Sequence, residues 1–382
     1  MTPLSDRRHF LKLTLASGLC GLSKPAELLA ANEASRLTGI DKIRASFPAL
    51  SEGAYFQTGA FGPSPLRVMK RTQALLELQN TNPAHPDVIG QLKKAESDCR
   101  TLLATTLGAK PEEVALTANT TAGINTILWS IDWKAGDEII IGNQEHPALL
   151  LPVYTLQRRF GVVMKQAPVE NGDSVVAEVL KRVSPRTRLV AISHVSRGSG
   201  AVLPAAELAS ALRDRGIPLL LDGAQGPGNI EVNFQALGCD YYTLCGHKWL
   251  LGPKGTGALL IRADRLTATP VSWTGSGAQA SFDEHGAMEW QPDARRFEFS
   301  TRFLAGYGGW HESLTWLSEL GWPEIRSRIA KLSAHAGEHA RKTSGMQLVS
   351  PSTASQRNGI VVVRLPEGLT GAALYQRLYQ EH

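Results

Sequence analysis

The sequence contains no apolar run long enough to cross a membrane, and it has only four cysteines in 382 residues. A membrane-spanning helix needs about 18 or more consecutive apolar residues, so a polytopic membrane protein is excluded. The cysteines form no CxxC pair and show no regular spacing; they are Cys20, Cys99, Cys239 and Cys245. A disulfide framework or a zinc cluster is therefore not expected.

An excess of charge of one sign is also missing. The chain has 40 Lys and Arg against 35 Asp and Glu, which leaves a net charge of +5 without any long basic run. Because nucleic-acid binding requires a clustered basic surface, we expect no nucleic-acid partner. Hydrophobic residues make up 43% of the chain, which is enough for a large core and excludes wholesale disorder.

Residues 1–31 have the layout of an export signal. The pattern RRHFLK at 7–12 is followed by a moderately apolar stretch that ends near Leu22. This resembles the twin-arginine signal, with Asp6 in place of the usual serine or threonine before the arginine pair. The resemblance implies a periplasmic or exported protein that keeps no membrane anchor after cleavage. The alternative is an amphipathic N-terminal helix.

From residue 113 onward, short apolar segments alternate with segments of helical periodicity. We expect strands at 113–117, 137–141, 162–166, 188–193, 217–222, 239–244 and 257–261. We expect helices between these strands at 122–131, 147–160, 174–183 and 204–215. Short apolar strands separated by helices are typical of a parallel sheet covered on both faces. The predicted fold is a three-layer α-β-α protein with a mostly parallel sheet.

Further elements flank this alternating region. Before it we expect Tyr55–Pro65 to hold a strand that leads into a Gly/Pro loop, followed by helices at 67–79 and 87–107. After it we expect one long helical stretch at 302–343, a strand at 359–365 and a helix at 370–380. These last elements predict a small α+β domain after the main sheet.

The ends of the expected strands carry most of the reactive side chains. In an open α/β sheet, ligands bind outside the carboxyl ends of the strands. The candidates at those ends are Thr120, Thr121, Glu145, His146, His194, Ser196, Asp222, Gln225, His247 and Lys248.

Asp222 and Lys248 together suit pyridoxal phosphate. A buried lysine forms a Schiff base with an aldehyde, and a buried aspartate keeps a pyridine nitrogen protonated. The segment 120–123 offers hydroxyls and the free N–H groups of a helix start to a phosphate.

Other interpretations of these residues were weighed. Asp222 alone would be a helix cap or turn former, and Lys248 alone a surface lysine. The three histidines lack the spacing of four residues typical of zinc ligands on a helix. The segment GPKGTG at 252–257 lacks the GK[ST] ending of a nucleotide loop.

Three longer segments resemble one known family. SHVSRGSGAVLP (193–204), LLLDGAQGPGNI (219–230) and CGHKWLLGPKGTGAL (245–259) are similar to class V aminotransferases, which are fold-type I pyridoxal-phosphate enzymes. The third segment is closest to the isopenicillin N epimerase-like branch, and the family also includes cysteine desulfurases and selenocysteine lyases. The resemblance covers roughly residues 41–382 and implies pyridoxal phosphate as the cofactor.

The resemblance also implies roles for individual residues. Lys248 would bond to the cofactor as an aldimine and later shuttle a proton at the substrate α-carbon. Asp222 would pair with the pyridine nitrogen, Gln225 would donate to the ring's phenolate oxygen, and His146 would stack on the ring. Arg197 follows Ser196 where many members have asparagine, so a ring contact from that loop is not carried over.

A second group of residues would hold the phosphate. The resemblance assigns Thr120, Thr121 and His247 to it, while Cys245 replaces a frequent serine or threonine. Thr301, in the segment FEFSTRF, matches a threonine that often reaches the partner subunit's phosphate. The resemblance therefore implies a homodimer.

We predict four segments: a signal peptide (1–31), an N-terminal segment (32–60), a large cofactor-binding domain (61–300) and a small C-terminal domain (301–382). The small domain is expected to be incomplete, because the family's usual carboxylate-binding arginine has no counterpart before His382. Possible substitutes are Arg197, Arg295, Arg296 and Arg302.

The predicted function is that of a pyridoxal-phosphate enzyme with a small-molecule amino-acid substrate, by epimerase, carbon–sulfur lyase or aminotransferase chemistry. Three alternatives remain: sulfur chemistry of the desulfurase or selenocysteine lyase type, a degenerate cofactor-binding protein without turnover, and a secreted binding module without cofactor.

Overall fold

The computed structural model of the chain describes residues 39–51, 53–170 and 174–381. Residues 1–53 and 54–382 separate into two compact units. The described part of the first unit holds the helix α3 (Gly39–Ala45) and the 3-10 turn η1 (Pro48–Leu50). The arginine motif at 7–12 lies outside the described residues. Within the described ranges, no helix has the length and apolar character needed to span a membrane.

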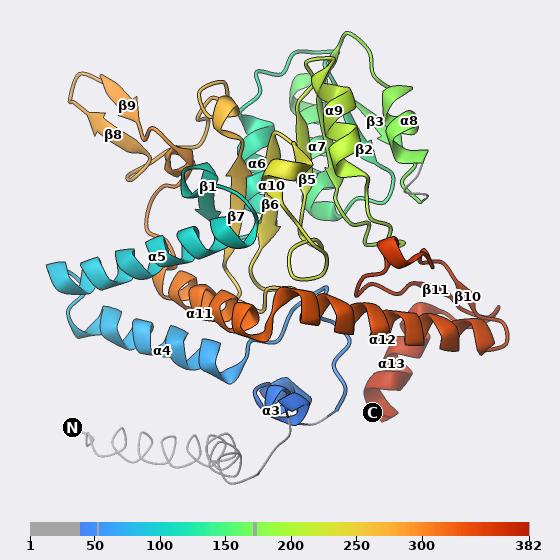
Figure 1. Cartoon of the computed structure of the whole chain (residues 1–382). Coiled ribbons are helices and arrows are strands. Elements are labelled where there is room, and N and C mark those ends of the chain that lie inside the picture. The colour runs from blue at the N-terminus through green and yellow to red at the C-terminus, as the bar shows by residue number, and fades with distance from the viewer. Residues whose placement is uncertain (1–38, 52, 171–173, 382) are drawn as a thin grey trace, which may run out of the picture. The chain divides into compact units, whose positions relative to one another are not determined.

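The second unit is built on a seven-stranded sheet with the order β1-β7-β6-β5-β4-β2-β3 (Figure 1). Neighbouring strands from β3 to β6 are parallel, and only β7 runs antiparallel to its two neighbours, β6 and β1. This confirms the expected mostly parallel sheet. The strands are β1 (Val114–Thr117), β2 (Glu138–Gly142), β3 (Val163–Ala167), β4 (Thr187–Ser193), β5 (Leu219–Asp222), β6 (Tyr241–Cys245) and β7 (Gly257–Ile261).

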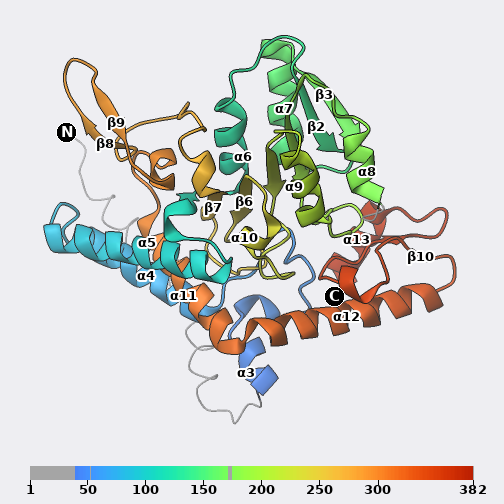
Figure 2. The same ribbon diagram turned by 45° about the horizontal axis from the view of Figure 1, so that its top comes forward.

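Helices cover both faces of this sheet (Figures 1 and 2). Right-handed crossovers that advance toward β3 place α6 (Thr120–Trp129) and α7 (Pro147–Phe160) on one face. Crossovers in the opposite direction place α8 (Val175–Leu180), α9 (Ala205–Arg213) and α10 (Phe234–Leu237) on the other face. The three-layer prediction is confirmed.

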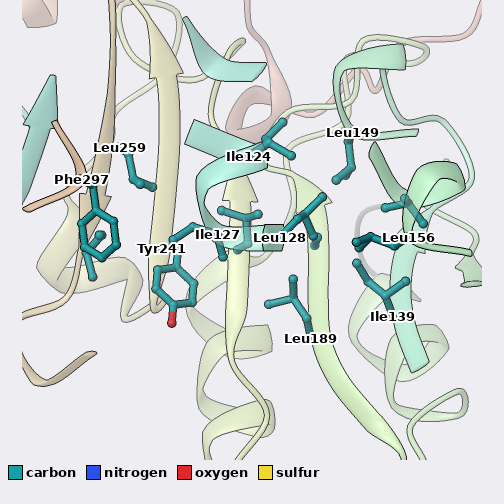
Figure 3. Packing of buried hydrophobic residues seen from close by; sticks show 14 of the residues in the cluster. Ile124, Ile127, Leu128, Ile139, Leu149, Leu156, Leu189, Tyr241, Leu259 and Phe297 are labelled. Carbon is teal, nitrogen blue, oxygen red and sulfur yellow. The ribbon is translucent and has the colours of Figure 1, made fainter. Parts of the chain in front are cut away.

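The core beneath α6 and α7 is a continuous apolar cluster (Figure 3). Ile139 of β2 lies in this cluster with Leu128 of α6 and Leu156 of α7 (Figure 3), and Ile141 belongs to the same cluster. Ile140 lies between them, points to the opposite face and is equally buried. Both faces of the strand are therefore covered, which explains its uninterrupted apolar sequence. Each such side chain contributes about 1.5–3 kcal/mol by leaving water.

Three long helices form a separate layer beside the sheet. The helices α4 (Leu66–Thr81) and α5 (Pro86–Thr106) both pack against α11 (Leu304–Leu320). A buried ion pair joins Arg100 of α5 to Glu298, whose carboxylate also pairs with Arg302 Nη1 at 2.6 Å. These charges fasten α5 to the segment that leads into α11.

The structure corrects two expectations for the chain's outer segments. The single helical stretch at 302–343 is two helices, because Gly321 adopts φ +86° and ends α11 before α12 (Trp322–Lys342). Tyr55–Pro65 holds no strand but a turn, in which the Tyr55 hydroxyl donates to the Phe61 carbonyl at 2.6 Å. Its glycines and prolines favour this turn over a β-strand, because proline has no N–H for strand pairing and glycine weakens a strand.

The remaining elements are short. The strand expected at 359–365 is reduced to two residues, which pair with one other short strand. A two-stranded hairpin after β7 was not expected, because its strands lack a clear apolar alternation. The domain boundaries at 60 and 300 stay predictions. These elements are β8 (Gln279–Phe282), β9 (Met288–Trp290), β10 (Gln347–Leu348), β11 (Val363–Arg364), α13 (Gly371–Glu381), η2 (Pro111–Glu113), η4 (Ala263–Arg265), η5 (Ala294–Phe297) and η6 (Ala354–Gln356).

Candidate active site

The carboxyl ends of β1, β2, β4, β5 and β6 all lie at one edge of the sheet, since these strands point in the same direction. Asp222 ends β5, Thr120 begins the helix after β1, and the loops after β2 and β6 carry His146, His247 and Lys248. The charges of Lys248 and Asp222 both act on His146, and that of Lys248 acts on His247. The topology therefore gathers most of the predicted site residues in one place.

Asp222 ends β5 as a buried carboxylate. Its side chain is 5% exposed, and its Oδ1 accepts from the Ala224 backbone N–H at 2.9 Å. Burial raises the pKa of Asp222, and the Ala224 N–H, Lys248 and His146 each oppose that rise. The residue is thus a turn former and also a buried acid facing a half-buried lysine.

His146 stands at the start of α7 and is held in its neutral form. Its Nδ1 accepts from the Ala148 backbone N–H at 3.0 Å, so the ring proton belongs on Nε2. Burial lowers the pKa of His146, and the positive charges of Lys248 and Arg197 lower it further, while Asp222 raises it. A cavity of about 420 Å³ adjoins the ring, and Thr121 and Trp129 of α6 form its other side.

Two buried polar atoms at this edge have no hydrogen-bond partner among the described residues. They are Thr120 Oγ1, in the first turn of α6, and His247 Nδ1, directly before Lys248. An unpaired buried polar atom costs about 1–3 kcal/mol. The adjacent start of α6, where Asn119 Oδ1 accepts from the Ala122 N–H at 2.9 Å, favours an anion. These groups fit the phosphate of pyridoxal phosphate.

Close backbone approaches place α6 and the lysine loop. A Cβ on Gly123 would lie 2.2 Å from Thr243 Oγ1, so only glycine allows α6 to pack this closely against β6. A Cβ on Gly62 would lie 2.0 Å from the Lys248 carbonyl oxygen, and the Gly62 N–H donates to the His247 carbonyl at 2.7 Å. The turn at 55–65 therefore packs directly on the backbone of the candidate lysine.

Gln225 is fixed by two contacts. Its Nε2 donates to the Gly59 carbonyl at 2.8 Å, and its Oε1 accepts from Trp249 Nε1 at 2.7 Å. One amide N–H remains for another acceptor.

Thr301 is exposed and follows Ser300, a residue with φ +64°. Such a conformation in a non-glycine residue is costly and is typical of functional segments. The roles of Gln225 and Thr301 stay predictions.

Sequence reasoning assigned no role to Glu145. Its carboxylate is 5% exposed and accepts from the Ser193 backbone N–H at 3.0 Å and from the Ser193 hydroxyl. Burial raises the pKa of Glu145 to about 7, against the hydrogen bonds from Ser193, and the charge of Asp222 adds to the rise. In the sequence, only its position next to His146 after an expected strand marks Glu145 as a candidate site residue.

His194 belongs to the core. It is 3% exposed, its Nδ1 lies 3.0 Å from the Tyr242 hydroxyl, and burial lowers its pKa to about 4. Its backbone N–H donates to the Asp222 carbonyl at 2.9 Å, which extends the pairing of β4 with β5 to the end of β5. In the described ranges, no three His, Cys, Asp or Glu side chains gather as metal ligands would.

A three-layer α/β fold with a strand-end lysine, a buried acid and an anion-binding helix start defines the class of pyridoxal-phosphate enzymes. Residues 54–381 match the family model described as aminotransferase class V. The chain therefore belongs to the class V aminotransferase family. It is a pyridoxal-phosphate-dependent enzyme, and its cofactor is pyridoxal phosphate.

Curated relatives and solved structures agree with this assignment. The chain is 32% identical to isopenicillin N epimerase of Streptomyces clavuligerus, over 85% of this chain and 83% of the relative. It is 31% identical to a probable cysteine desulfurase of Xylella fastidiosa (strain 9a5c), over 81% and 76% of the two chains.

The cystine C–S lyase C-DES, solved with cysteine persulfide, is similar with a TM-score of 0.82 and 28% identity, covering 87% of this chain and 90% of that one. A C-DES mutant with glycine covalently linked to its cofactor gives a TM-score of 0.83, also at 28% identity, covering 88% and 90%.

The raised pKa of Glu145 predicts a pH-dependent stability. In the folded state the Glu145 carboxyl keeps its proton up to about pH 7, whereas in the unfolded chain it loses it near pH 4.5. The protonated carboxyl therefore stabilises the fold fully below pH 4.5, and this stabilisation is lost as the pH rises to about 7. Relative to Glu145→Gln, the wild-type free energy of unfolding should fall by up to about 3 kcal/mol across this range. Urea unfolding at several pH values measures it, and parallel curves for the two proteins would contradict the prediction.

Proposed function

We propose that Lys248 bonds covalently to pyridoxal phosphate and that the enzyme acts at the α-carbon of an amino acid. The observation that carries this assignment is that Lys248 lies within electrostatic range of buried Asp222, at the sheet edge where two buried polar atoms, Thr120 Oγ1 and His247 Nδ1, have no hydrogen-bond partner among the described residues. Lysine, acid and phosphate ligands thus lie at the same sheet edge. When bound, the cofactor withdraws electrons from the substrate's α-carbon.

The residues around Lys248 have separate tasks in this proposal. Asp222 pairs with the protonated ring nitrogen, and burial strengthens that pair because few waters screen it. His146 presents a neutral ring to the cofactor face, since its Nδ1 is held by the Ala148 N–H. Gln225 would donate its remaining amide N–H to the ring's phenolate oxygen.

Lys248 also moves the proton at the α-carbon. The Gly62 N–H donates to the His247 carbonyl, and the Leu251 N–H donates to the Lys248 carbonyl at 3.0 Å, so hydrogen bonds hold the main chain around the lysine. Epimerase, lyase and aminotransferase reactions all need such a base. The proposed function is therefore proton transfer at the α-carbon, followed by the step that the substrate contacts select.

We further propose that the active unit is a homodimer. Thr301 is exposed and directly follows Ser300, whose backbone is strained at φ +64°. An exposed residue here could contact another subunit. Apolar side chains are exposed beside the site, and Leu151 of α7, which lines the cavity next to His146, is 60% exposed. A second copy of this chain would cover this surface and complete the phosphate site with Thr301.

We also propose export by the twin-arginine route, on the basis of the motif RRHFLK at 7–12. This route transports folded proteins, so the cofactor would be loaded before export.

Replacement of Lys248 tests the proposed function directly. The wild-type protein loaded with pyridoxal phosphate should absorb near the violet edge of the visible range, and Lys248→Ala should lose that band. After borohydride reduction, mass spectrometry should find the cofactor on Lys248. Lys254→Ala, in the same loop, serves as the control and keeps the band. A Lys248→Ala protein that retains it, or a wild type that no amino acid perturbs, would overturn the proposal.

The dimer has its own test. Analytical ultracentrifugation should give twice the mass of one chain, and Leu151→Arg should shift the protein toward the monomer because it places a charge in the apolar interface. Leu332→Arg, on α12, is the matched control because Leu332 is similarly exposed, at 57%. A monomeric wild type at micromolar concentration contradicts the dimer.

Export is tested by cell fractionation. Exchange of Arg7 and Arg8 for lysine should leave the protein in the cytoplasm at its unprocessed length, while Lys24→Arg should be exported as the wild type is. Equal export of both variants would show that the motif is not read as a signal.

A further inference from the structure

Glu145 is a buried acid at the site that the proposed function does not use. It directly precedes His146, and its side chain is 5% exposed. The carboxylate lies back against the end of β2, because a Cβ on Gly142 would be only 2.4 Å from Glu145 Oε1. A side chain at position 142 would therefore displace this carboxylate.

The Glu145 carboxylate joins two neighbouring strand ends. Its Oε1 accepts from the Ser193 backbone N–H at 3.0 Å, and its Oε2 accepts from the Ser193 hydroxyl. Ser193 ends β4, which is a neighbour of β2 in the sheet. One buried side chain thus ties the loop between β2 and His146 to the end of β4.

The same hydrogen bonds place Glu145 near Asp222. Ser193 is the partner of Asp222 in the register of β4 and β5, so both acids adjoin the same serine. The negative charge of Asp222 raises the pKa of Glu145, which agrees with two carboxylates in electrostatic range of each other. The structure therefore places a second buried acid next to the one that ends β5.

The other titratable groups around Glu145 do not neutralise its charge. Among the described residues, no lysine, arginine or histidine forms an ion pair with it. His194 follows Ser193 and is neutral above about pH 4, because burial lowers its pKa to about 4. Lys248 and Arg197 act on His146, the residue after Glu145. A cation bound beside Asp222 would therefore be stabilised by two negative charges whenever Glu145 is ionised.

We propose that Glu145 is a positioning residue of the site, which fixes the end of β4 beside Asp222 and adds a second negative charge near that acid. This rests on the proposed function, in which Asp222 pairs with the protonated ring nitrogen. The positive charge of the bound cofactor favours the ionised form of Glu145, and this form accepts from both donors of Ser193. Glu145 thus acts on the cofactor through Ser193 and Asp222.

A pH titration of the cofactor-loaded protein tests the charge. The violet-absorbing form carries a proton where the cofactor joins Lys248, and a nearby negative charge retains that proton to higher pH. Glu145→Gln keeps the size of the side chain and one acceptor oxygen but removes the charge. The midpoint of the absorbance change should therefore fall by about 0.5–1 pH unit.

Glu170→Gln is the matched control for this titration. Glu170 Oε1 accepts from Asn143 Nδ2 at 2.5 Å, on the same loop as Glu145, but both of these side chains are exposed. Water and salt screen an exposed charge, so the midpoint of this variant should equal that of the wild type.

A double-mutant comparison tests the hydrogen bonds to Ser193. Ser193→Ala removes one donor to Glu145, so the dissociation constant of the cofactor should rise by about 2- to 10-fold. In a Glu145→Ala background the same change should have little further effect, because the hydrogen bonds are already absent. Equilibrium dialysis measures the four constants without any turnover.

Two results would overturn the proposal while the visible band, and with it the proposed function, stays intact. The first is an unchanged midpoint in Glu145→Gln, and the second is an equal effect of Ser193→Ala in both backgrounds. A wild-type protein that shows no visible band would instead overturn the proposed function, and this proposal with it.

Discussion

Burial of ionisable groups at the carboxyl edge of the sheet is the constraint on which the site depends. Removal from water disfavours the charged form of each group there, so it raises the pKa of Asp222 and Glu145 and lowers that of His146 and His247. Lys248 then acts on this set with a positive charge that lowers the pKa of all but Glu145. The edge thus holds two imidazoles with lowered pKa values, one lysine and two buried acids, which is an environment suited to a charged ring and its phosphate.

Backbone contacts decide whether these groups meet. Gly123 and Gly62 bring α6 and the turn at 55–65 within distances that any side chain would prevent. The bond from Thr243 Oγ1 to the Thr120 carbonyl, at 3.0 Å, then holds the start of α6 over β6. The position of Thr120, the proposed phosphate ligand, therefore depends on the absence of a Cβ at Gly123 as much as on any polar contact.

The fold by itself does not choose the reaction, because one scaffold supports different chemistry through the groups around the substrate. In this chain, some arginines near the sheet are held in ion pairs and others are not. A network of ion pairs ties α5 to the segment before α11; its members are Arg100, Glu298, Arg302 and Glu96. These charges are paired with one another and stabilise the fold. Arg197 stands on a hydrogen-bonded turn, and its side chain has no ion pair with any residue that the structure describes.

The sequence by itself determined the alternation of strands and helices, since apolar runs such as Glu138–Gly142 need cover on both faces. It also placed Lys248, Asp222 and Thr120 correctly at strand ends. The break at Gly321, the absence of a strand before the loop in 55–65 and the hydrogen bonds between Glu145 and Ser193 did not follow from it. These depend on contacts between distant segments and on burial. Only the tertiary structure decided which arginines form ion pairs that hold the fold together, such as Arg100 and Arg302, because a guanidinium's partner is set by what packs beside it.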